Sequence, residues 1–106
     1  MLDVKPAAAL MDAVYTGLED QVALTADLVR FPSRRGNEAM AQDFMAGQMH
    51  ERGLDVDRFK VDIEEIRHLP GFSPVHVSYD NAWNVVGTRR APTATGRSLI
   101  LNGHID

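Results

Sequence analysis

The chain has 106 residues, of which 11 are Lys or Arg and 15 are Asp or Glu, so its formal net charge at pH 7 is −4. This acidic balance argues against the basic surface that nucleic-acid binding requires. Hydrophobic residues make up 44% of the sequence and charged residues 25%, which is typical of a folded globular domain. The absence of Cys excludes disulfides, thiolate metal sites and a Cys nucleophile.

The amino-terminal segment carries no recognisable export or membrane signal. Residues 1–6 include an early acid and Pro6 and lead into no sustained apolar stretch, so we expect neither a signal peptide nor a transmembrane helix. The expected location is the cytoplasm, and neither a membrane nor nucleic acid is expected as a partner. The length limits residues 1–106 to one small domain or part of a larger one.

Two helices are predicted before the first strand. Helical spacing of apolar residues predicts the first from Ala7 to about Arg30, and Pro32 ends it because its ring removes an amide donor. The apolar stripe of this helix consists of Met11, Val14, Leu18, Val22 and Val29. The second helix is expected to begin after Asn37 as its N-cap and to run to about Arg52, with Gly53 as its stop. Its methionines fall at helical spacing and are expected in the core: Met40, Met45 and Met49.

The remainder of the chain predicts strands, which makes the fold class α/β. Residues 54–61 alternate with period two, which indicates a strand, with a bulge or face change near Phe59. A short helical turn is expected over residues 62–66 and a loop over residues 68–78. Residues 84–88 and 98–102 are the next strand candidates. The loop of residues 89–97 is too short for a crossover helix, so these two strands would pair antiparallel if they are neighbours.

The strand predicted over residues 98–102 carries the candidate chemistry. Leu99, Ile100 and Leu101 form an unbroken apolar run, which favours a strand covered on both faces of a mixed sheet. His104 and Asp106 follow at its carboxyl end, where catalytic groups gather in α/β sheets. Residues two apart point to the same side of an extended backbone. Asp106 can therefore accept the Nδ1 proton of His104 and leave Nε2 free to bind a metal.

The surrounding sequence strengthens this interpretation. Residues 98–106, together with Asn84-Val85-Val86-Gly87 and the earlier segments 28–33 and 36–38, resemble the amino-terminal part of a zinc-dependent amidohydrolase family. That family includes acetylornithine deacetylase, succinyl-diaminopimelate desuccinylase, aminoacylase and glutamate carboxypeptidases. The resemblance extends over nearly the whole chain in the expected order. Its most specific stretch is Leu99-Ile100-Leu101-Asn102-Gly103-His104-Ile105-Asp106.

The resemblance implies a metal-dependent enzyme acting on an N-acyl amino acid or a peptide. His104 matches the family's first metal-binding His, and Asp106 matches the catalytic-site acid that orients it. The implied cofactor is Zn²⁺, two ions per active site, with Co²⁺ as a substitute. The implied partners are a small-molecule substrate and, for the full-length protein, a second copy in a homodimer. The family's other ligands and its general base follow the position of Asp106, so residues 1–106 are expected to be an inactive part of the catalytic domain, without the lid or dimerisation domain.

Chemistry leads to the same expectation for the chain alone, because a catalytic zinc site needs about three protein ligands and one His with one acid does not provide them. In the complete enzyme, a metal-activated water deprotonated by a Glu would attack the amide carbonyl. No substrate-binding residue is identified. The alternatives are a carboxypeptidase or dipeptidase of the same family, and a non-catalytic truncated binding module. Spacing alone favours a surface His and a terminal acid as the explanation of His104 and Asp106, and the surrounding resemblance reverses this preference.

Other candidate residues have simpler explanations. His50 suits the carboxyl end of a helix, and His68 and His76 match no common metal spacing. Glu64 and Glu65 imitate a family motif but precede the His-x-Asp strand, so a solvated turn is expected. Ser33, Arg34 and Arg35 could suggest an anion site, but no glycine-rich phosphate loop follows a strand there, and a turn between helices is expected instead. The sequence leaves open whether Tyr79 and Trp83 pack or border the cleft.

Overall fold

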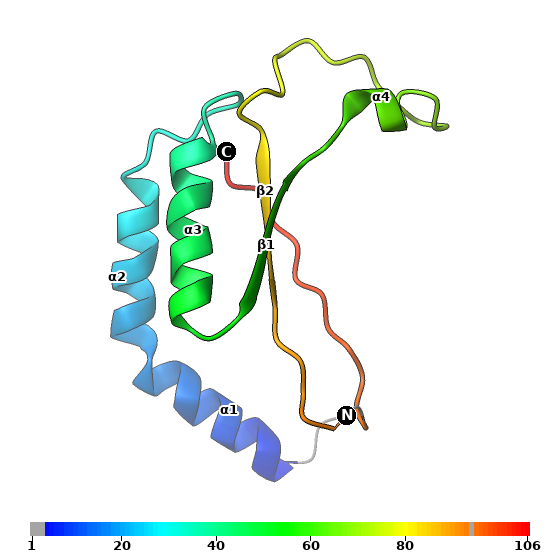
Figure 1. The fold of residues 1–106 in the computed structure, drawn as a ribbon. Helices are drawn as coiled ribbons and strands as arrows, with labels where there is room; N and C mark the ends of the chain where they lie inside the picture. Colours follow the sequence, from blue (N-terminus) through cyan, green and yellow to red (C-terminus); the bar gives the residue numbers. More distant parts are fainter. Residues whose placement is uncertain (1–3, 94) are drawn as a thin grey trace. The chain divides into compact units, whose positions relative to one another are not determined.

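The computed structural model describes residues 4–93 and 95–106, which form two compact units, one ending at Phe31 and the other running from Pro32 to Asp106. Residues 1–3, used above to judge an export signal, and residue 94 of the loop of residues 89–97 lie outside this description. The described elements are α1 (Val4–Thr16), α2 (Leu18–Val29), α3 (Ala39–Glu51), β1 (Asp55–Lys60), α4 (Ile63–Ile66) and β2 (Trp83–Thr88) (Figure 1). Mixed α/β structure is therefore confirmed.

The first unit contains two helices where the sequence predicted one. The chain bends between α1 and α2 at Gly17, whose φ of −89° and ψ of 4° lie outside the helical region (Figure 1). Gly is about 1 kcal/mol less favourable than Ala inside a helix, so it is the weak point of this segment. The predicted apolar stripe is not buried: Val22 is 59% exposed and Val29 is 75% exposed. The prediction that the helix ends before Pro32 is confirmed.

A tight turn leads into α3. The Asn37 N–H donates to the Arg34 carbonyl at 2.7 Å, which closes the turn of residues 34–37. Gly36 has a φ of +88°, as the third residue of a type II turn requires. The prediction of Asn37 as N-cap is wrong, because its side-chain amide donates to the Pro32 carbonyl and Glu38 takes the N-cap position. Glu38 makes no side-chain capping bond.

The end of α3 agrees with the sequence. The helix ends at Glu51, one residue before the predicted end, and Gly53 follows with a φ of +75°. A left-handed residue at this position is common after a helix because it lets the chain turn and satisfies the last carbonyls. The Gly53 N–H donates to the His50 carbonyl, and His50 lies in the last turn as expected.

The sheet of the second unit consists of β1 and β2, which pair antiparallel. The register runs without interruption from Asp55 opposite Thr88 to Lys60 opposite Trp83. The predicted bulge near Phe59 is therefore absent from this ladder, since each residue of β1 has one partner on β2. The predicted strand over residues 84–88 is confirmed and extended by one residue at its start.

Helix α3 packs against both strands. A Cβ added to Gly87 would lie 2.8 Å from Leu54 and 2.8 Å from Met49, so the absence of a side chain allows the helix to approach β2. Ala41 is the one fully buried hydrophobic residue in the described part of the chain. The core role predicted for the methionines holds for Met49 in this contact but not for Met40, which is 51% exposed.

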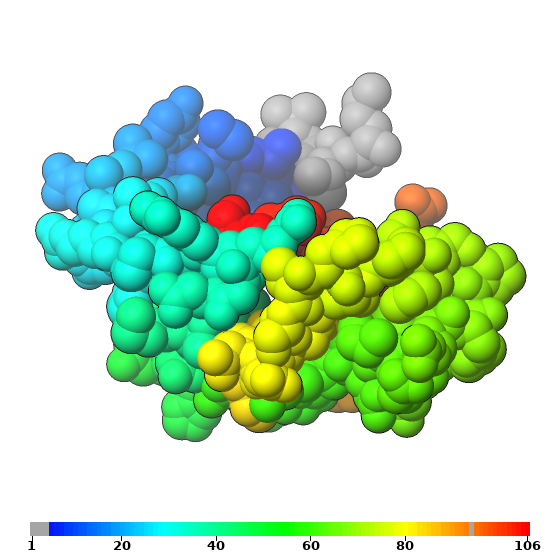
Figure 2. Space-filling model, turned by 90° about the horizontal axis from the view of Figure 1, so that it is seen from above, coloured from blue at the N-terminus to red at the C-terminus, as the bar shows by residue number. Residues whose placement is uncertain are grey.

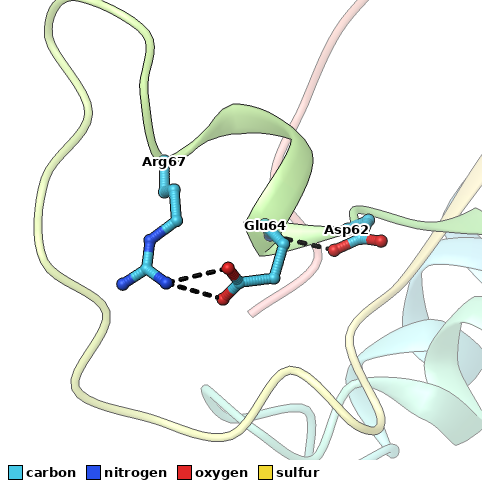
Figure 3. Close-up of polar contacts among 3 residues, drawn as sticks. All are labelled: Asp62, Glu64 and Arg67. Carbon is cyan, nitrogen blue, oxygen red and sulfur yellow. Dashed lines mark hydrogen bonds and ion pairs between the residues drawn. The ribbon is translucent and has the colours of Figure 1, made fainter.

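Helix α4 confirms the short helical turn predicted after β1. The Asp62 carboxylate accepts a hydrogen bond from the Glu64 N–H at 2.9 Å and caps this single turn (Figure 3). Glu64 also pairs with Arg67 at 2.8 Å. Glu64 and Glu65 are exposed, as a solvated turn requires.

The strand predicted over residues 98–102 is not formed. The chain turns back after β2, but these residues adopt no strand and pair with neither β1 nor β2 among the described residues (Figure 1). Leu99, Ile100 and Leu101 are 81%, 88% and 86% exposed. The prediction of a buried strand in a mixed sheet is therefore wrong for this structure, because apolar residues form such a strand only when other elements cover both of its faces.

No helix in residues 4–93 and 95–106 combines the length and the apolar character needed to span a bilayer.

Candidate functional site

A hollow of about 630 Å³ in the second unit contains both candidate site residues. This volume lies within the range of about 300–1,000 Å³ that is common for small-molecule sites. The carboxyl-terminal residues lie between the residues that lead into α3 and the segment before β2 (Figure 2). Four parts of the chain line the hollow: residues 35–42 near α3 with Arg35, Gly36, Glu38 and Gln42, Val61 after β1, the segment of residues 73–84 with Tyr79, Trp83 and Asn84, and the end of the chain from Asn102 to Asp106.

His104 and Asp106 contact each other as the sequence predicted. The His104 Nδ1 lies 3.1 Å from an Asp106 carboxylate oxygen. In the neutral tautomer that carries its proton on Nδ1, the Nδ1–H donates to this carboxylate and the lone pair is on Nε2. The His104 side chain is 95% exposed and that of Asp106 is 31% exposed. The pair therefore presents an accessible ring nitrogen at the hollow, although no strand supports it.

Trp83 forms part of the wall of the hollow and is held by two cations from β1. The Arg58 guanidinium lies 4.8 Å from the centroid of the Trp83 ring, and the Lys60 ammonium lies 4.7 Å from it. Arg58 also pairs with Asp43 on α3, which ties the helix to the strand beside the ring. A cation within about 6 Å of an aromatic centroid is attracted to the ring. These contacts restrain Trp83. Trp83 and Tyr79 both line the hollow, which answers the question that the sequence left open.

Glu38 faces the hollow from the start of α3, but its carboxylate is directed into the protein. One carboxylate oxygen accepts a hydrogen bond from the Gly36 N–H at 2.8 Å. The other oxygen is buried and has no hydrogen-bond partner among the described residues, and the same is true of the Ser33 hydroxyl. One carboxylate oxygen of Glu38 is therefore closed to a ligand in the hollow, and the other is already engaged by the Gly36 N–H.

His104 is the candidate metal ligand, and the described residues do not complete a metal site around it. His104 has the donor type and the free nitrogen that zinc binding requires. However, no three His, Asp or Glu side chains come together as a metal site within residues 4–93 and 95–106. The histidines do not gather at one place, because His76 lines the hollow whereas His50 and His68 do not. A metal held at His104 would need further ligands from outside this set of residues.

The sequence did not identify Arg35 as a residue of the site. It was assigned to a turn between helices, which is correct, but the turn also brings it to the hollow that His104 lines. The available signal was the Arg-Gly pair just before a helix, which indicates a tight turn. Which surface that turn would face depends on residues about 70 positions later in the chain, and local sequence carries no such information.

Comparison with protein-family models, with curated proteins and with solved structures finds no match to this chain.

Proposed function

We propose that this chain forms part of the catalytic domain of a metal-dependent amidohydrolase that removes the acyl group from an N-acyl amino acid. The observation that carries the proposal is the contact between the His104 Nδ1 and Asp106 at the edge of a hollow of ligand size. The resemblance of residues 98–106 to the zinc-dependent amidohydrolases supports it. The proposed location is the cytoplasm, and the proposed assembly of the complete enzyme is a homodimer.

Each residue has a defined part in this proposal. His104 would bind Zn²⁺, or Co²⁺ as a substitute, through Nε2, and Asp106 would hold the ring in that orientation. The bound metal would polarise the amide carbonyl and lower the pKa of a water molecule. Trp83 and Tyr79 would form an aromatic wall beside the substrate. The remaining ligands and the general base would come from residues that follow Asp106 in the complete reading frame.

The first test is to read the coding DNA past Asp106. The proposal expects a bridging Asp, a Glu-Glu pair and a distal His in the translated sequence. A stop codon directly after Asp106 would instead support the non-catalytic binding module.

The second test is an assay on the product of the complete reading frame. We expect release of free amine from N-acetyl amino acids, loss of this activity with a chelator, and recovery with Zn²⁺ or Co²⁺. The substitution His104→Ala should abolish activity and reduce the bound metal measured by elemental analysis. His68→Ala is the matched control and should change neither, because His68 is exposed and lies outside the hollow. If the protein hydrolysed only dipeptides, or removed only carboxyl-terminal residues from peptides, the proposed deacylase would be wrong and the alternative of a dipeptidase or carboxypeptidase would be supported.

A further inference from the structure

The second unit places one cationic side chain at the hollow with no partner among the described residues. Arg35 is the one Arg or Lys in the lining, and no ion pair or side-chain hydrogen bond engages it within residues 4–93 and 95–106. By contrast, Arg30, Arg58 and Arg67 each pair with a carboxylate. A guanidinium has five N–H donors in a planar fork that matches a carboxylate, so an unpaired one at a small-molecule hollow is suited to binding an anion.

The acids around the hollow do not neutralise Arg35. Glu38 is the nearest in sequence, but one of its oxygens accepts from the Gly36 N–H and the other is buried. Asp106 is engaged by His104. Both carboxylates therefore have other roles, and the Arg35 guanidinium remains free to meet an anionic group.

The backbone holds Arg35 in place without using its side chain. Arg35 occupies the second position of the turn closed by the Asn37 N–H and the Arg34 carbonyl, and Gly36 supplies the positive φ that the turn needs. The adjacent Arg34 lies in the same turn but does not line the hollow. The two neighbouring arginines are thus a natural comparison, since they have the same charge and similar surroundings in the sequence.

We propose that Arg35 binds the free carboxylate of the substrate and makes the hollow selective for N-acyl amino acids over their neutral carboxamides. This inference rests on the proposed function for the identity of the substrate. The aromatic side chains of Trp83 and Tyr79, which line the hollow, would accept the rest of the amino acid, and the amide to be cleaved would lie towards His104. Arg35 is a residue for binding and specificity, with no part in the bond-breaking step.

The test compares N-acetyl-L-alanine with N-acetyl-L-alaninamide, which differ only in the charged group. Binding to the chelator-treated product of the complete reading frame is measured by calorimetry, and kcat and KM are measured with metal restored. The wild-type protein should bind the carboxylate about tenfold more tightly than the carboxamide, as a charge-assisted hydrogen bond predicts. Arg35→Met should remove this preference and raise KM for N-acetyl-L-alanine by a similar factor. Arg35→Lys should keep part of it, and Arg34→Met should leave it unchanged.

The outcomes separate this inference from the proposed function. Preference for the carboxylate that depends on Arg35, in a protein that hydrolyses neither compound, would support the inference and contradict the proposed enzyme. Hydrolysis of N-acetyl-L-alanine, with the same preference for the carboxylate in the wild-type protein and in Arg35→Met, would support the proposed enzyme and overturn the inference. Equal losses in Arg34→Met and Arg35→Met would show a general effect of charge and overturn the inference. Equal binding of the two compounds by the wild-type protein, or binding of neither, would also overturn it.

Discussion

The His104–Asp106 contact lies at the surface, and this determines what it contributes. The His104 side chain is 95% exposed, so water competes for both ring nitrogens. Pairs exposed to this degree contribute little to stability. Their effect is on orientation, because the carboxylate favours the proton on Nδ1 and so leaves Nε2 as the available donor.

We therefore expect Asp106→Ala to change the tautomer of His104 rather than the stability of the chain. In the neutral ring, the proton population should move from Nδ1 towards Nε2, because the carboxylate acceptor is gone. Nitrogen-15 chemical shifts of the imidazole measure this directly. His68 provides an internal control in the same spectrum, and its ring should not change. Identical His104 shifts before and after the substitution would mean that the contact does not orient the ring.

In the metal-dependent enzyme proposed above, the same orientation should affect metal affinity. Partners that hold a metal-binding His typically account for about 10- to 100-fold in affinity or activity. Asp106→Ala should therefore weaken zinc binding by about this factor without removing the ligand itself. Competition with a chromophoric chelator measures the affinity, and His104→Ala gives the larger loss for comparison.

Among the elements, those governed by neighbouring residues agree best with the sequence. The short α4 is an example, since Asp62 caps it through the Glu64 N–H two residues later (Figure 3). Helix α3 ends where Gly53 allows a positive φ. The start of α3 differs from the prediction because the turn of residues 34–37 uses the Asn37 side chain to hold Pro32, which leaves Glu38 at the N-cap.

The cap of α4 provides a local test. Asp62→Ala should cost about 1 kcal/mol of local stability, the usual effect of losing an N-cap. Hydrogen exchange at the Glu64 amide should accelerate about fivefold as a result. Asp62→Asn is the matched control, because its side-chain oxygen can still accept from the same N–H. Equal acceleration in both variants would mean that the carboxylate charge, rather than the hydrogen bond, stabilises the turn.

The packing of α3 on the sheet provides a second test. Gly87→Ala places a methyl group 2.8 Å from the Leu54 and Met49 side chains. Both side chains are flexible at their ends, so we expect a cost at the lower end of the usual range for overpacking, about 1 kcal/mol. Hydrogen exchange in the β1–β2 ladder should accelerate accordingly. Gly96→Ala has open space around it and should have no effect on this ladder.

At the scale of the whole molecule, the chain buries little of its surface. Many large apolar side chains are exposed in both units, including Tyr15 at 68% and Ile100 at 88%. Hydrophobic burial is the main favourable term in folding, so the 106-residue chain has little to offset its conformational entropy.

We therefore expect the 106-residue chain on its own to be marginally stable. It should bind the dye ANS and unfold over a broad temperature range, because few apolar groups leave water on folding. Dye fluorescence and circular dichroism provide the measurements. The longer product that the proposed function expects is the control, and it should bind little dye and unfold sharply. A sharp transition without dye binding in the 106-residue chain would contradict this expectation.

The features of this protein that depend on residues close together in the chain could be predicted from the sequence. The bounds of α3, α4 and β2 were close to the prediction, and the approach of His104 to Asp106 was correct, because hydrogen bonds and spacing within a few residues govern these features. The pairing of β2 with β1, the exposure of Leu99 and the meeting of Arg35 with the end of the chain at one hollow were not predicted. Contacts between distant segments of the chain decide these features. The periodicity of apolar residues in the sequence indicates which side chains could be buried, but it does not indicate which other elements are present to bury them.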